Sequence, residues 1–177
     1  MNRRLVAITG ISLVTSMLCA GPYVLATEPA FTLGQLSQAH QLLEMWLECT
    51  ECDRGELKAV ARLGAMAVPT LITTLKKGPS QAKREIMRLR LIRSYKQLTE
   101  YKDSHHVLTA TESEPEYIAH YLENYVAQYQ IRAAIALAEI GGPAARHALK
   151  EALATPLRKD VARVVNESLG KFGKASP

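Results

Sequence analysis

The chain has 177 residues, of which 47% are hydrophobic and 22% are charged, and this composition is typical of a globular protein and not of a disordered tail. The formal net charge is +5, and the +3 that would remain after removal of the export signal described below is too small to indicate nucleic-acid binding. Runs of β-branched residues that alternate with polar ones are nearly absent, which argues against an all-β sandwich or barrel.

The first 26 residues have the pattern of an export signal. Arg3 and Arg4 precede an apolar run from Leu5 to Ala20, and small or short side chains end the segment at Ala26. We expect cleavage after Ala26, which would give a periplasmic or secreted chain with a net charge of +3, since both arginines are removed. An uncleaved membrane anchor, a lipoprotein signal at Cys19 and the twin-arginine export route are the alternatives.

The rest of the sequence predicts helices and no strand. We expect a linker over residues 27–35 and then one all-α domain over residues 36–172. In chain order, the predicted helices cover residues 36–48, 56–63, 67–77, 80–101, 113–140, 143–154 and 156–169.

Residues with strong positional preferences mark the ends of these helices. Asp53 with Glu56, and Ser113 with Glu116, have the spacing of capping boxes at helix starts. Helix ends are predicted at Gly64, Gly78, the Gly141-Gly142-Pro143 segment and Gly170, and a Thr155-Pro156 start is predicted for the last helix. A polar loop is predicted over residues 102–112.

Two segments of the sequence repeat each other. Residues 59–75 and 135–153 share their apolar spacing, and Leu63-Gly64 matches Ile140-Gly141 at an offset of 77 residues. This offset is close to two units of about 40 residues, the unit length of helical solenoids. Stacked helix pairs would bury Ala and Leu stripes that a single pair leaves exposed.

Residues 131–153 resemble a HEAT repeat of the short bacterial kind that also occurs in phycobilin lyases, and residues 63–71 resemble its turn and second helix. The resemblance implies an α-solenoid of antiparallel helix pairs, with regular units at 53–77 and 130–170 and an atypical middle at 78–129. It also implies a scaffold or binding role without catalytic residues. The lyase activity is not carried over, because no lyase active-site pattern is present.

Cys49 and Cys52 would be the only cysteines left after signal cleavage. A lone pair at this spacing in an oxidising compartment favours a structural disulfide. A redox-active pair beside the helix that follows Asp53 is one alternative. A metal site is another, although it would need further ligands.

All six tyrosines that follow the signal segment lie between residues 95 and 129, and four of them recur at every fourth position from 117 to 129. This ladder either belongs to a buried helix face or lines a groove for a protein, a peptide or a glycan. The partner-binding hypothesis places the surface in the atypical middle, because regular solenoid units mainly supply stability. Its candidate residues are Arg88, Arg93, Tyr117, Tyr121, Tyr125, His105 and His106.

Charges are unevenly distributed in this middle segment. Residues 76–102 contain nine Lys and Arg and two Glu, whereas residues 103–130 contain five acidic residues and no Lys or Arg. The pattern predicts two neighbouring antiparallel helices of complementary charge. Peripheral contact with anionic lipid or with an acidic partner stays open.

No pattern establishes a cofactor or a metal site. Glu116, His120 and Glu123 share a helix face and could hold a metal with Glu112 or Glu114, but a solvated polar face is the simpler interpretation. We therefore expect an exported, monomeric HEAT-like protein that binds a protein partner in the cell envelope without catalysis. The alternatives are a thiol-disulfide redox protein that uses the two cysteines, and an envelope enzyme with a site near Glu116, His120 and Tyr121.

Overall fold

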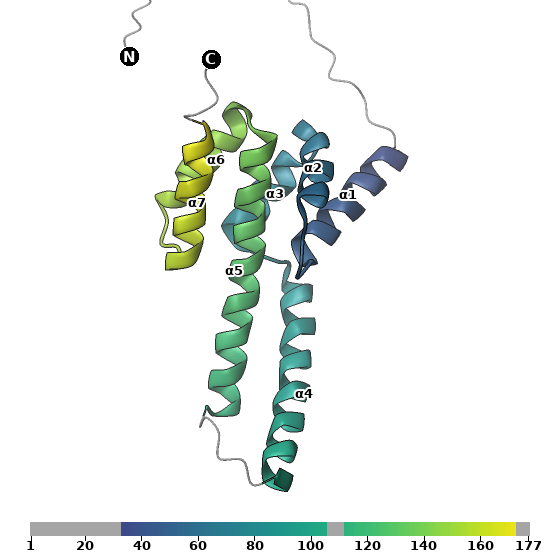
Figure 1. Cartoon of the computed structure of the whole chain (residues 1–177), viewed down its shortest axis with the longest axis vertical. Helices are drawn as coiled ribbons and strands as arrows, with labels where there is room; N and C mark the ends of the chain where they lie inside the picture. Colours follow the sequence, from purple (N-terminus) through teal and green to yellow (C-terminus); the bar gives the residue numbers. More distant parts are fainter. Residues whose placement is uncertain (1–32, 106–111, 173–177) are drawn as a thin grey trace, which may run out of the picture. The chain divides into compact units, whose positions relative to one another are not determined.

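The computed structural model describes residues 33–105 and 112–172, so the predicted signal segment and His106 lie outside the described residues. Within these ranges the chain forms seven α-helices, one short 3-10 helix and no strand, which confirms the predicted all-α class (Figure 1). The helices are α1 (Leu33–Glu48), α2 (Arg54–Arg62), η1 (Gly64–Met66), α3 (Val68–Lys77), α4 (Gln81–His105), α5 (Glu114–Ile140), α6 (Gly142–Leu153) and α7 (Lys159–Phe172).

Both predicted capping boxes are present. At the start of α2, the Glu56 amide donates to Asp53 Oδ1 at 2.9 Å and the Asp53 amide donates to Glu56 Oε2 at 3.0 Å. At the start of α5, the Ser113 amide donates to Glu116 Oε2 at 2.9 Å. These reciprocal bonds satisfy amide groups that have no partner within the helix, so each box fixes its helix start locally.

Four predicted boundaries are wrong. Helix α1 begins at Leu33, within the predicted linker, and not at residue 36. Helix α4 continues through His105, because residues 102–105 contain no Gly or Pro to end it. Of the rest of the predicted loop, residue 112 is non-helical and residues 106–111 lie outside the described residues. Helix α7 begins at Lys159, since the Thr155 hydroxyl donates to the Ala152 carbonyl at 2.8 Å and so caps the end of α6. Gly170 lies inside α7, because the helix continues to Phe172, which packs against the core.

The core is centred on α5, which packs against every other α-helix of the described chain. The second half of α5 contributes Ala133, Ala134, Ala136 and Leu137, which are fully buried. Alanines at these positions let neighbouring helices approach closely, as the Ala-rich sequence predicts. Helix α1 is joined to this core by two hydrogen bonds. Trp46 Nε1 donates to the Arg132 carbonyl at 3.2 Å, and the Arg132 guanidinium donates to the Leu47 carbonyl at 2.9 Å.

Helix α4 and the first half of α5 form an antiparallel pair that extends away from the other helices (Figure 1). We call this pair, residues 81–105 and 114–125, the arm. Helix α4 packs mainly against α5, whereas the second half of α5 belongs to the core. Among the described helices, none combines the length and the apolar character that crossing a membrane requires.

Candidate functional site

One side of α4 carries exposed aliphatic and cationic residues together. Ile86 is 51% exposed and Leu89 is 48% exposed, which is unusual for large aliphatic side chains. Arg90, Arg93 and Lys96 are also exposed, and none of the three forms an ion pair within the described part of the chain. The helical spacing of these five residues places them on one face, which we call the outer face of α4.

The opposite side of α4 packs against α5. Leu91 is buried there, and the ring of Tyr95 lies 5.3 Å from the ring of Tyr117. The Tyr95 hydroxyl donates to the Glu112 carbonyl at 3.0 Å, which ties α4 to the residues that precede α5. The arm is therefore held together by aromatic and aliphatic contacts.

The exposed side of α5 in the arm is acidic. Glu116, His120 and Glu123 are exposed, and His120 Nδ1 lies 3.4 Å from a carboxylate oxygen of Glu112. The predicted adjacency of α4 and α5 is confirmed, but no ion pair between the two helices occurs among the described residues. The two charged faces point to solvent because the sides of the helices that face each other are apolar and aromatic.

The tyrosine ladder passes from solvent into the core. Tyr121 is 45% exposed, Tyr117 and Tyr125 are half-buried, and Tyr129 is only 2% exposed. The buried-face interpretation therefore describes Tyr129, while Tyr121 is accessible to a partner. The rings of Tyr117 and Tyr121 lie 4.5 Å apart, so these two side chains form one aromatic surface.

The other candidate binding residues occupy different environments. Arg88 is exposed and pairs with Glu85 of its own helix at 3.0 Å, whereas Arg93 has no such partner among the described residues. His105 is the last residue of α4, and His106 lies outside the described residues. The arm thus brings Arg93 and Tyr121 to accessible positions, and sequence reasoning missed the exposed Ile86 and Leu89 because their apolar character is typical of core residues.

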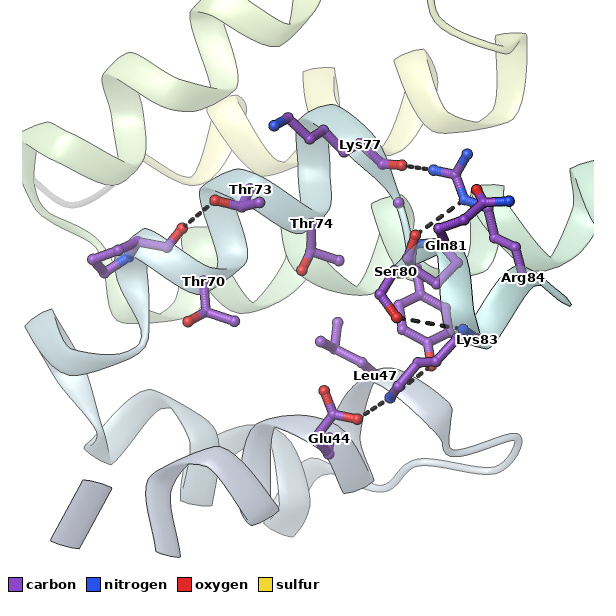
Figure 2. A pocket seen from close by; sticks show the side chains of 14 residues that line it. Glu44, Leu47, Thr70, Thr73, Thr74, Lys77, Ser80, Gln81, Lys83 and Arg84 are labelled. Atoms are coloured by element: carbon purple, nitrogen blue, oxygen red, sulfur yellow. Dashed lines mark hydrogen bonds and ion pairs between the residues drawn. The ribbon is translucent and has the colours of Figure 1, made fainter. Parts of the chain in front are cut away.

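A cleft of about 580 Å³ lies where the arm joins the core, and the sequence did not predict it (Figure 2). We call it the α1–α3 cleft. Its walls come from α1, α3, the segment between α3 and α4, and the first turn of α4, and Tyr129 of α5 also contributes. These segments are distant in sequence, so a local pattern contains no signal for the cleft.

A polar cluster at the edge of this cleft joins α1 to the arm. The Lys83 ammonium forms ion pairs with Glu44 and with Glu48, whose Oε1 atom is 2.5 Å away. It also lies 3.4 Å from the Tyr129 hydroxyl oxygen. The Tyr129 hydroxyl donates to Glu48 Oε1 at 3.0 Å and accepts from the Tyr125 hydroxyl at 3.2 Å. Three helices therefore share one hydrogen-bond network.

Burial shapes the protonation of this cluster. Burial lowers the pKa of Lys83, and burial, together with the hydrogen bond from Tyr125 and the charge of Glu48, raises the pKa of Tyr129. Two carboxylates beside Lys83 favour its charged form, so the cluster is a structural ion-pair network at neutral pH.

Cys49 and Cys52 lie close together between α1 and α2, with Cα atoms 5.7 Å apart, a distance that a disulfide permits. Each of the two sulfur atoms lies within 4.8 Å of a Glu56 carboxylate oxygen, and no other set of three His, Cys, Asp or Glu ligand atoms is this close among the described residues. Glu116, His120 and Glu123 are thus not gathered into such a group. Glu56 already accepts the capping bond from Asp53, so its carboxylate has a structural role.

The chain was compared with protein-family models, with curated proteins and with solved structures. None of the three comparisons found a match.

Proposed function

We propose that this protein is an exported helical scaffold of HEAT-like type, which binds a partner protein in the cell envelope through its arm. The observation that carries the proposal is the outer face of α4, where Ile86 and Leu89 are exposed beside three cations that lack ion pairs within the described residues. Protein interfaces often combine an aliphatic or aromatic centre with arginine. Tyr121 on the other helix of the arm adds an exposed aromatic side chain.

Packing of the core supports the HEAT-like part of the proposal. Helices α2 and α3 would form one unit, and the end of α5 with α6 would form the other. Gly64 and Gly141, at the matched turns, both have positive φ values of 54° and 75°. Between the two units, α2 packs against α5 and α3 packs against α6, as expected of stacked units, whereas α2 and α3 make few contacts within their own unit and α3 packs most against α5. The arm would then be an insertion between the two units.

Export and the disulfide belong to the same proposal. Signal cleavage would give a mature chain that begins near Thr27 in the periplasm or outside the cell. The cysteines would then form a structural disulfide, since the neighbouring carboxylates of Glu51, Asp53 and Glu56 disfavour the thiolate that redox catalysis needs. N-terminal sequencing of the exported protein tests the processing, and retention of Met1 would contradict it.

Photo-cross-linking in intact cells tests the binding surface. A photoreactive amino acid in place of Leu89 should give cross-linked partner bands, whereas the same residue in place of Lys150, which is exposed on α6, should give none. Cross-links from position 150 alone would place the interface on the regular units.

A charge-matched pair of variants then measures the contribution of the arm once a partner band is identified. Arg93→Glu should weaken binding of that partner by about tenfold or more, while Lys159→Glu, with the same charge change on α7, should leave it unchanged. Equal losses in both variants would show that net charge matters and the outer face does not.

A further inference from the structure

The α1–α3 cleft contains a threonine hydroxyl group that has no hydrogen-bond partner among the described residues. Thr74 lies on the α3 wall and is 7% exposed, and its hydroxyl forms no hydrogen bond within the described residues. Among the described residues, every side-chain oxygen or nitrogen that solvent cannot reach has a hydrogen-bond partner. Since the Thr74 hydroxyl has no partner, it must be accessible from the cleft. Figure 2 shows it directed into the open space between α3 and α1, with Thr70 one turn away.

The first turn of α4 forms one end of the same cleft. Ser80 and Gln81 line the cleft there, and the amides of Gln81 and Ala82 have no hydrogen-bond partner among the described residues. This helix has 25 residues, and its first turn contains no acidic side chain to occupy those amides. Free amides and the positive end of the helix dipole favour an anionic group.

Charged side chains around the cleft agree with this preference. Lys77 and Arg84 both line the cleft. Within the described residues, Lys77 forms no ion pair and Arg84 donates only to the carbonyls of Lys77 and Pro79. The one carboxylate in the lining is Glu44, whose charge is offset by its ion pair with Lys83. The cleft is thus rich in donors and has a surplus of positive charge.

We propose that the α1–α3 cleft binds a peptide segment that carries a carboxylate, with the carboxylate at the Gln81 and Ala82 amides and the Thr74 hydroxyl. A volume of about 580 Å³ is far larger than a single carboxylate needs. Leu47, Pro69 and Pro79 line the remainder, so they give apolar contact area for neighbouring side chains of the peptide. This site is separate from the outer face of α4 and does not depend on the function proposed for the arm.

Two-dimensional ¹H–¹⁵N NMR of the full mature chain tests the site with defined probes. The probes are the peptide acetyl-Ala-Leu-Ala-Leu as the free acid, the same peptide as the C-terminal amide, an amidated peptide with Glu in place of one Ala, and sodium acetate. The free acid should shift the amide signals of Gln81 and Ala82 and bind about tenfold more tightly than the neutral amide, because a charge-assisted hydrogen bond is lost in the amide. Binding of the Glu peptide would identify a side-chain carboxylate as sufficient, and acetate alone should bind more weakly than either peptide.

A matched pair of variants separates the site from general effects. Thr74→Val removes the open hydroxyl at nearly constant volume and should weaken binding of the free acid about fivefold or more. Thr99→Val is the control, since Thr99 lies outside the cleft and its hydroxyl already donates to the Tyr95 carbonyl at 3.0 Å, and it should leave binding unchanged. Equal shifts with the acid and the amide, shifts confined to other regions, or no shift at millimolar peptide would each overturn the proposal.

Discussion

Two glycines with the same backbone conformation but different surroundings allow a sharp stability prediction. Gly78 has φ 70° and ψ −156°, and Gly141 has φ 75° and ψ −162°, a region that only glycine adopts readily. A Cβ atom at Gly78 would lie 2.8 Å from Val126 Cγ1, whereas a Cβ atom at Gly141 would meet no atom within 4 Å. Gly141→Ala should therefore lose about 1–3 kcal/mol of unfolding free energy through strain alone. Gly78→Ala should lose a further 1–3 kcal/mol or so through overpacking, about 2–6 kcal/mol in total.

Urea unfolding followed by circular dichroism measures both losses on the mature protein. In a double-mutant cycle, Val126→Ala should recover part of the loss in the Gly78→Ala background, although it is destabilising in the wild-type background. Equal losses at the two glycines, or strictly additive effects of Gly78→Ala and Val126→Ala, would refute the argument that the close approach of α5 excludes a side chain at position 78.

Three further predictions use other parts of the structure. Leu137→Ala should lower the free energy of unfolding by about 2–5 kcal/mol in the same assay, because Leu137 is 0% exposed. Leu98→Ala in the arm, where Leu98 is 40% exposed, should lower it by less than about 1 kcal/mol. Equal losses would show that the core is wrongly placed. Arg158 donates a hydrogen bond to Asp160 and lowers the pKa of this carboxyl to about 2, so the pair stabilises the fold above the ordinary pKa of 3.8 and this stabilisation is lost as the pH falls through about 2. Since the Asp160 side chain is 38% exposed, Asp160→Asn should cost only about 1 kcal/mol at pH 7, and a cost that persists unchanged at pH 2 would contradict the assignment. Replacing Cys49 and Cys52 by Ser should cost about 1–3 kcal/mol, and labelling of both thiols by alkylation before reduction in freshly isolated protein would count against a disulfide.

Helix starts were predictable where their determinants are local. Asp53 and Glu56, or Ser113 and Glu116, are three residues apart and form their capping bonds within one turn, so the sequence contains all the information needed. Gly64 adopts a positive φ of 54° at the predicted end of a helix for the same reason. Thr155 was misassigned because the hydroxyl of a threonine can serve the helix before it as readily as the helix after it, and only the structure shows which.

The candidate site was less predictable because it depends on contacts between distant segments. The position of the arm follows from the long helical patterns on either side of the predicted loop, and Tyr121 of the ladder is exposed there. Ile86 and Leu89 look like core residues in sequence, and they are exposed because none of the described helices packs on that side of α4. Lys83 and Glu44, which are 39 residues apart, meet at the cleft without any sequence signal.

The contact between Gly78 and Val126 also means that the chain leaves the core and returns to it at almost the same point. The intervening segment, residues 79–125, is therefore not needed to connect the two parts of the core. A turn of a few residues would be long enough to join the end of α3 to the second half of α5. Such an excised protein would keep Leu71, Leu75, Leu137 and Leu149 in one cluster, because none of these side chains comes from the deleted segment. The core cluster thus specifies the fold without the outer part of the arm, whose length and surface can be engineered separately, whereas the base of the arm is tied to α1 by the ion pairs of Lys83 with Glu44 and Glu48.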